Sequence, residues 1–291
     1  MSKNSIHAGL ISACEGIFRC PICYNPMRMV QSRSLICAKQ HCFDLSKQGY
    51  INLALQGYKT KYNKRLFESR RTICRSGFFE PLNERISSRI GAVLNTANKE
   101  VRVLDAGCGE GSHLHSIQGK LARNIPVDLL GVGMDLSKEG ISSASREYPD
   151  LIWCVADIAK CPFANEQFNF ILNLLSPSNY AEFKRMLSDD GFVIKVIPER
   201  EYLQELRDFL SHKPEKQSYS NNSTIERFRE HFARMDMERV RYRFPLDHTL
   251  IEPLLHMTPL SWGTAAERLK QIPEMNMTEI TIDLTILIGK K

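Results

Sequence analysis

Four cysteines and a histidine gather near the start of the chain, in the segment CPICYNPMRMVQSRSLICAKQHC, residues 20–42. Cys20 and Cys23 are separated by two residues. After thirteen intervening residues come Cys37 and His41, which are separated by three. Three thiolates and an imidazole form a donor set suited to tetrahedral zinc, and four protein ligands leave no position for an activated water. The spacing therefore predicts a structural zinc site, in which Cys42 could replace the adjacent His41 as fourth ligand.

A disulfide staple, or cysteines that merely pack, are the alternatives to zinc. The first eighteen residues lack the basic start, long apolar middle and small-residue cleavage site of a signal peptide. The chain contains no apolar run of eighteen residues, so no segment is predicted to span a membrane. We therefore expect a cytoplasmic protein whose thiols stay reduced, which disfavours disulfides.

A second group of residues that could take part in binding or chemistry lies in VRVLDAGCGEGSHL, residues 101–114. An apolar run ends at Asp105 and is followed by glycines at positions 107, 109 and 111 and then by a helical pattern. Glycines in such a turn let the backbone approach a ligand closely. The order strand, glycine turn, helix predicts the start of a nucleotide-binding α/β unit, although the spacing G-x-G-x-G differs from that of dinucleotide enzymes.

Polar residues also end the next three apolar runs. Asp135 ends the second run, where its carboxylate could accept hydrogen bonds from ribose hydroxyls, and Asp157 ends the third, where it could meet an adenine amino group. The fourth run finishes at the loop of residues 176–178, Ser-Pro-Ser. Any one acid could instead cap a helix or lie in a solvated loop. The ordered set predicts a doubly wound parallel α/β sheet with its ligand beyond the strand ends, and it resembles class I methyltransferases that use S-adenosylmethionine.

Positive charge is concentrated in the first eighty residues. They contain 13 Lys and Arg against 4 Asp and Glu, or +9, whereas the rest of the chain has 26 against 29, or −3, which gives the net +6 of the whole. A basic front end on a nearly neutral body predicts contact with a polyanion, although a solvated basic surface is the plainer alternative.

The segment 58–82 interleaves basic residues with aromatic ones. Lys and Arg can neutralise phosphates while aromatic rings stack on unpaired bases. The alternative is an amphipathic helix whose apolar side chains pack on the main domain. The residues predicted to contact RNA are Lys59, Lys61, Lys64, Arg65, Arg70 and Arg71.

The zinc knuckle, the basic connector and the methyltransferase unit, in this order, resemble the bacterial 23S ribosomal RNA (guanine-N1) methyltransferases of the RlmA type. The resemblance is carried over most of the chain by CPIC, ICAKQHCFDLSKQGYINL, SRRTICRSGFFEPL, VLDAGCGEG, GMDLSK and MTPLSW. LLSPSNYAEFKRML and YKTKYNKRLFESRR are similar to the Gram-positive branch, which includes the tylosin-resistance enzyme. The resemblance implies methylation of a guanine in a 23S RNA hairpin near the peptide exit tunnel, an effect on macrolide sensitivity, and a homodimer.

The resemblance also implies roles for individual residues. It favours His41 over Cys42 as the fourth zinc ligand. Phe79 stands where some members have tyrosine, so a contact that needs the hydroxyl is lost, and Tyr202 stands where some members have histidine. The residues expected at the cofactor are Phe79, Asp105, Gly107, Gly109, Glu110, Asp135, Asp157 and Tyr202.

The chemistry predicted is in-line transfer of a methyl group from a sulfonium to a nitrogen, so the enzyme must align the two atoms and exclude water. Guanine N1 lies on the pairing edge, so the target base must be unpaired or flipped out. The Ser-Pro-Ser loop lacks the Asn/Asp-Pro-Pro-Tyr/Phe pattern of exocyclic-amine methyltransferases, which disfavours adenine-N6 chemistry. No residue is identified that removes the N1 proton.

Two other functions remain open. A small-molecule methyltransferase with a structural zinc module would not need the basic first eighty residues. A non-catalytic protein that binds zinc and RNA would not need the intact set of Asp105, Gly107, Gly109 and Asp135.

Three parts are expected along the chain: a zinc-binding RNA-recognition module (1–57), a basic helical connector (58–95) and the methyltransferase domain (96–291). Residues 191–198 predict a strand. Residues 211–224 predict a polar loop in which His212 is solvated. The alternation of apolar and polar residues from Met277 predicts a late strand that closes the sheet. His113 and His115 are expected on helix faces. Met257 and Trp262 either line the base pocket or pack.

Overall fold

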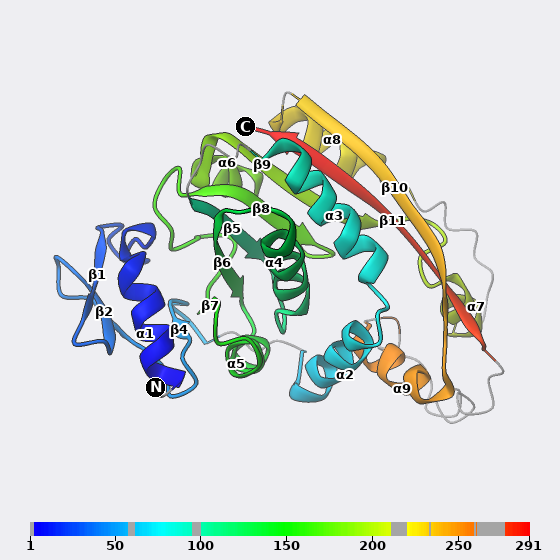
Figure 1. Cartoon of the computed structure of the whole chain (residues 1–291), viewed down its shortest axis with the longest axis horizontal. Coiled ribbons are helices and arrows are strands. Elements are labelled where there is room, and N and C mark those ends of the chain that lie inside the picture. Colours follow the sequence, from blue (N-terminus) through cyan, green and yellow to red (C-terminus); the bar gives the residue numbers. More distant parts are fainter. Residues whose placement is uncertain are drawn as a thin grey trace.

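The computed structural model describes residues 3–57, 62–94, 100–210, 220–232, 234–258, 260 and 277–291. At its centre is an eight-stranded sheet of order β10-β11-β9-β8-β5-β6-β7-β4 (Figure 1). Six neighbouring strands are parallel: β4 (Ile51–Asn52), β5 (Glu100–Ala106), β6 (Asp128–Asp135), β7 (Ile152–Val155), β8 (Phe168–Leu174) and β9 (Leu187–Pro198). Their middles are nearly continuous apolar runs, because a parallel sheet in an α/β fold is covered on both faces.

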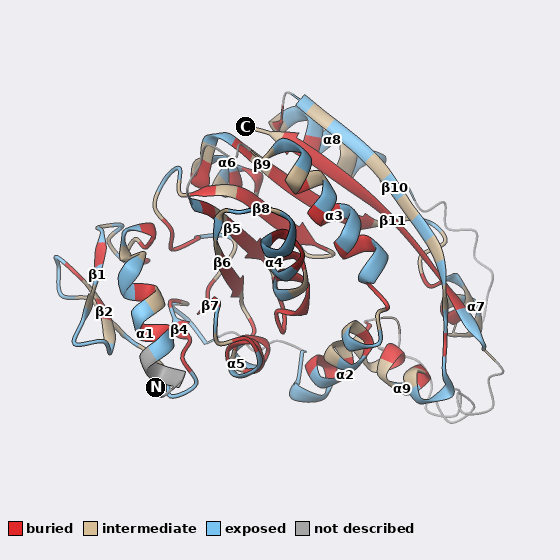
Figure 2. Cartoon of the chain, in the orientation of Figure 1, coloured by how far each residue is buried: buried red, intermediate tan, exposed pale blue. Residues whose placement is uncertain are grey.

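Helices cover both faces of this sheet, as the buried sheet and half-exposed helices of Figure 2 show. Alternate residues of β5 divide between two cores: Val101 and Val103 join one, Leu104 and Ala106 the other. The first core takes its helical side chains from α3 (Glu80–Val93), α4 (Ser112–Asn124) and α5 (Lys138–Glu147), among others. The second takes them from α1 (Lys3–Ala13), α6 (Tyr180–Met186) and α8 (Asn222–His231). The predicted doubly wound α/β class is confirmed.

The late strand predicted from Met277 is β11 (Glu279–Lys290), but it does not end the sheet. It lies antiparallel between β9 and β10 (Arg234–Pro245), a strand not predicted from the sequence. The sandwiched position explains why ten consecutive residues of β11 are buried. Its buried polar residues are paired: the Asp283 carboxylate accepts two hydrogen bonds from Arg239, at 2.8 and 2.7 Å.

The N-terminal unit is a small antiparallel sheet of β1 (Met27–Val30), β2 (Ser34–Cys37) and β3 (Cys42–Asp44), preceded by α1 and a short 3-10 turn, η1 (Glu15–Ile17). Several contacts attach it to the rest of the chain, among them those of β4 and Phe18. β4 pairs in parallel with β7, and the Phe18 ring packs against Phe163 with centroids 5.7 Å apart. The expected module of residues 1–57 therefore supplies the outermost strand of the large sheet.

Three further helices complete the described structure: α2 (Lys64–Arg75), α7 (Gln204–Leu210) and α9 (His248–Met257). The α2 helix begins at Asn63, whose side chain accepts a hydrogen bond from the Leu66 backbone N–H at 3.0 Å. It lies against α9, as Figure 1 shows. None of the described helices is both long and apolar enough to cross a membrane.

Candidate functional site

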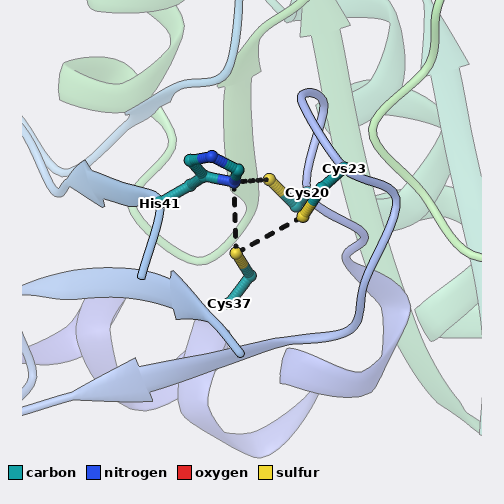
Figure 3. A group of neighbouring side chains, drawn as sticks. All are labelled: Cys20, Cys23, Cys37 and His41. Atoms are coloured by element: carbon teal, nitrogen blue, oxygen red, sulfur yellow. Dashed lines mark hydrogen bonds between the residues drawn. The ribbon is translucent and has the colours of Figure 1, made fainter. Parts of the chain in front are cut away.

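The four candidate zinc ligands converge on one point, from two different turns of the small N-terminal unit (Figure 3). The Nδ1 atom of His41 lies 3.4 Å from the Cys20 sulfur and 3.5 Å from the Cys37 sulfur, and the Cys23 and Cys37 sulfurs are 3.6 Å apart. Ligands about 2.3 Å from a tetrahedral zinc lie roughly 3.8 Å from one another, so this donor set fits the ion. Cys42 is exposed and lies outside the group.

Local turns explain how the sequence positions these ligands. The Cys20 backbone N–H donates to the Asn25 carbonyl at 2.8 Å, which closes a knuckle around Cys23, and Tyr24 in this knuckle has a positive φ of 61°. In the second turn the Cys37 backbone N–H donates to the His41 carbonyl at 3.1 Å. Cys20 and Cys37 are buried, whereas Cys23 and His41 are partly exposed.

A cavity of about 670 Å³ lies beyond the carboxyl ends of the parallel strands, within the size range of cofactor sites. Its lining includes the glycine loop, the ends of β6 and β9, the loops after β7 and β8, and one face of α2. None of the described residues 3–57 of the N-terminal unit lines it. Six of the eight residues predicted at the cofactor do: Phe79, Gly107, Gly109, Asp135, Asp157 and Tyr202.

Asp135 ties the glycine loop to the next helix. One carboxylate oxygen accepts a hydrogen bond from the Gly109 backbone N–H at 2.9 Å, and the other accepts from the Ser137 N–H at 2.7 Å. Gly109 has a φ of +59°, which favours glycine. Burial raises the pKa of Asp135, and these two backbone donors oppose the rise. The spare lone pairs of the carboxylate remain suited to ribose hydroxyls.

Asp105 and Glu110, also predicted at the cofactor, are buried near the glycine loop and are not among the cavity lining residues. Glu110 accepts a hydrogen bond from the Ser112 hydroxyl at 2.6 Å and lies 3.8 Å from Arg70. Among the described residues, Oδ1 of Asp105 has no hydrogen-bond partner. Their contact with a cofactor stays a prediction.

The buried Asp105 carboxyl predicts a pH dependence of folding. Burial raises its pKa from 3.8 to about 7; Arg70 opposes the rise, and Asp135 and Glu110 add to it. An acid whose pKa is raised on folding costs stability as it ionises, so this contribution is lost between about pH 4 and pH 7. Relative to Asp105→Asn, the free energy of unfolding of the wild type should fall across that range and then level off. Urea unfolding of both proteins at several pH values from 4 to 8 measures this. A difference in unfolding free energy between the two proteins that does not change with pH would contradict it.

The aromatic residues predicted at the cofactor lie on the wall of the cavity. Phe79 packs edge-on against Phe78 and against the His113 ring, both with centroids 4.8 Å apart. His113 is buried, and burial together with Arg70 lowers its pKa to about 3, so it is neutral and structural.

His115 is exposed on the α4 face, as expected. His212 and Trp262 lie outside the described residues, whereas Met257 lines the cavity.

Lys195, which sequence reasoning missed, holds the loop after β8 in place. Its ammonium donates to the Asn173 side-chain oxygen at 2.8 Å, to the Ser178 hydroxyl at 2.7 Å and to the Ser176 carbonyl at 3.2 Å. Burial lowers its pKa to about 8. The signal was present in GFVIKVIP, since a lysine inside an apolar central strand requires buried acceptors.

The connector residues predicted to contact RNA are placed differently from one another. Lys64 is exposed and Arg65 forms an exposed ion pair with Glu252, 2.6 Å apart. Arg71 pairs with Glu147 at 2.9 Å, and Arg70 lines the cavity. Lys59 and Lys61 lie outside the described residues. The apolar residues of α2 pack as an amphipathic helix, so the packing alternative holds for them, and the RNA contacts stay a prediction.

Comparison with known proteins adds family information to this geometry. Residues 18–55 match the model described as RlmA, N-terminal, a zinc ribbon, and residues 103–191 match a methyltransferase domain. The chain is 44% identical over 282 residues to the Bacillus subtilis protein named putative 23S rRNA (guanine-N(1)-)-methyltransferase YxjB, covering 94% of this chain and 97% of that one.

Two further relatives carry related names. A Streptomyces fradiae protein named 23S rRNA (guanine(748)-N(1))-methyltransferase is 28% identical, covering 93% of this chain and 95% of its own. A putative 23S rRNA (guanine-N(1)-)-methyltransferase of Micromonospora griseorubida is 27% identical, covering 86% and 88%.

Proposed function

This chain belongs to the family of 23S rRNA (guanine-N1)-methyltransferases, and from that premise we propose that it methylates N1 of a guanine in 23S ribosomal RNA. The observation that carries the proposal is the combination of a Cys3His zinc cluster with a cavity bounded by the glycine loop and Asp135. S-adenosylmethionine supplies the methyl group as a sulfonium. The cluster lies outside the cavity, so the role proposed for its zinc is structural.

The chain's own residues support the alignment step. Asp135 fixes the glycine loop through Gly109, and the Lys195 network fixes the loop after β8 on the other side of β5. Both loops line the same cavity, so the glycine loop and Asp135 would hold the cofactor, which would supply the methyl group, and the acceptor base would enter the same cavity. Because guanine N1 is on the pairing edge, we propose that the base is unpaired or flipped when it enters.

The zinc unit offers a surface suited to RNA. Tyr24 in the first knuckle is 53% exposed, with the Arg19 guanidinium 4.8 Å from its ring centroid, and Ile22 beside it is half exposed. Arg28 and Arg33 are exposed on the same unit. Basic groups beside an exposed aromatic ring can bind phosphates and stack on an unpaired base. We propose that this unit recognises the RNA.

Three finer statements belong to the same proposal. The target is a guanine in a hairpin loop near the peptide exit tunnel, where methylation would affect sensitivity to macrolides such as tylosin. The enzyme acts in the cytoplasm, where ribosomal RNA is modified. It acts as a homodimer. Light scattering at working concentrations would then give a particle with twice the mass of one chain.

The test compares acceptors. Labelled S-adenosylmethionine is supplied with 23S RNA from cells lacking the modification, with 16S RNA, and with small-molecule amine acceptors, and the modified position is mapped by primer-extension arrest. We expect label in 23S RNA only, at a single arrest site, and weaker RNA binding as salt rises. Label on small molecules alone would contradict the proposal.

A further inference from the structure

One cavity-lining residue has no partner that explains its position. Arg70 was predicted on the RNA surface, yet it lies on the buried face of α2, three or four residues from Leu66, Phe67 and Ile73. Its side chain is 22% exposed. An added Cβ on Gly109 would lie 3.4 Å from Arg70 Nη1, so the guanidinium sits directly over the glycine loop.

The N–H donors of this guanidinium make no hydrogen bonds within the described part of the chain. Among the described residues its nearest acidic partner is Glu110, 3.8 Å from Nε, which is too long for a hydrogen bond, and no hydrogen bond is formed by any of its nitrogen atoms. A guanidinium carries five N–H donors in a fixed fork that matches a carboxylate. Buried polar groups are normally satisfied, so donors left open to a cavity indicate a ligand.

Two other cations line the cavity among the described residues. The Lys195 ammonium donates to three acceptors. Arg207 donates to the Arg200 carbonyl, although its buried Nε has no hydrogen-bond partner among the described residues. Burial acts to lower the pKa of Arg70, but Cys74 and the acids Glu110, Asp105 and Asp135 raise it on balance, so the guanidinium stays charged. A cofactor carboxylate bound here would come with the cationic sulfonium and ammonium of the same molecule, which suit the acidic surroundings, whereas an RNA phosphate would bring no such positive charge.

We propose that Arg70 binds the carboxylate of the methionyl part of S-adenosylmethionine over the glycine loop, and thereby selects cofactors that carry this group. The inference rests on the proposed function only for the identity of the cofactor. It gives the connector a second task, because the helix α2 then forms part of the cofactor site as well as a link to the zinc unit.

The test is a binding cycle that requires no RNA, so it stands even if the proposed RNA substrate fails. S-adenosylhomocysteine and its decarboxylated analogue are titrated calorimetrically into wild type, Arg70→Met, Arg70→Lys and the control Arg75→Met. Arg75 is an exposed residue of the same helix and is not among the cavity lining residues. A bidentate charged contact predicts that the wild type prefers the carboxylate ligand by roughly 30-fold. Arg70→Met should lose most of this preference and bind the decarboxylated ligand as the wild type does. Arg70→Lys should keep part of the preference, and Arg75→Met all of it.

Three results would overturn the inference. The first is a preference that survives in Arg70→Met within about threefold of its wild-type value, where the lost contact alone predicts a tenfold change or more. The second is an equal loss of affinity for both ligands, which would indicate a structural role. The third is unchanged cofactor binding in the cycle together with weakened 23S RNA binding in a separate filter-binding measurement, which would assign Arg70 to a phosphate. Arg70→Lys keeps the inference open to disproof if Arg70→Met does not fold.

Discussion

Replacing Cys37 with serine is expected to release the zinc ion, lower the melting temperature and abolish RNA methylation while cofactor binding persists. The Cys37 sulfur lies 3.6 Å from that of Cys23 and 3.5 Å from His41 Nδ1, so its loss opens the donor set. The matched zinc ribbon is short, at residues 18–55, and units below about 40 residues rarely fold without a metal or disulfide. Zinc contributes roughly 10–16 kcal/mol to the folding of such units.

The effect should extend beyond the ribbon because the N-terminal unit supplies β4 to the main sheet and packs Phe18 on Phe163. A fall in melting temperature of roughly 5 °C or more is expected for a chain of this size. Binding of S-adenosylhomocysteine should survive, since no residue from 3 to 57, the described part of the N-terminal unit, lines the cavity.

Cys42→Ser is the matched control for this experiment. Cys42 is adjacent to His41, yet it is exposed and lies outside the cluster. It should retain one equivalent of zinc by metal analysis, with full activity. Zinc retained by Cys37→Ser and lost by Cys42→Ser would contradict the ligand set proposed here.

Replacing Asp135 with alanine is expected to weaken cofactor binding by roughly 100-fold or more, because it removes two charge-assisted hydrogen bonds of about 1.5–3 kcal/mol each and the proposed ribose acceptor. Those bonds run to the Gly109 and Ser137 backbone N–H groups, so the glycine loop and the start of α5 lose their common anchor. Calorimetric titration with S-adenosylhomocysteine measures the affinity.

Asp128→Ala provides the control, because Asp128 is an exposed acid at the opposite end of the same strand, β6. Its affinity should equal that of the wild type. Asp135→Asn keeps one acceptor oxygen and should fall between the two. An Asp135→Ala protein that folds normally and binds within about threefold of the wild type would refute the role proposed for this carboxylate, since even one lost charged hydrogen bond predicts more.

Features set by neighbouring residues were predictable from the sequence. The zinc ligands come in two close pairs, and the glycine loop directly follows an apolar run, so spacing along the chain describes each of them. The doubly wound sheet followed from the same alternation of strands and helices, and the structure confirms it.

Features that depend on distant pairing were missed. The strand β10 shows alternation in Val240, Tyr242 and Phe244, but its place beyond β11 follows from pairing between residues 34 to 56 positions apart. The contact of β4 with β7 links residues about a hundred positions apart. Arg70 was assigned to RNA because its neighbours are basic, although its helical spacing from Leu66 and Ile73 already put it on the packed face.

The central claim is that this chain forms 1-methylguanosine in 23S RNA. The most direct measurement digests 23S RNA to nucleosides after reaction with labelled S-adenosylmethionine and identifies the labelled product by chromatography and mass spectrometry. The account predicts one labelled nucleoside, 1-methylguanosine, formed by the wild type and absent with Asp135→Ala. Label on guanine N2 or N7, on adenine, or on no RNA nucleoside while the cofactor binds, would contradict it.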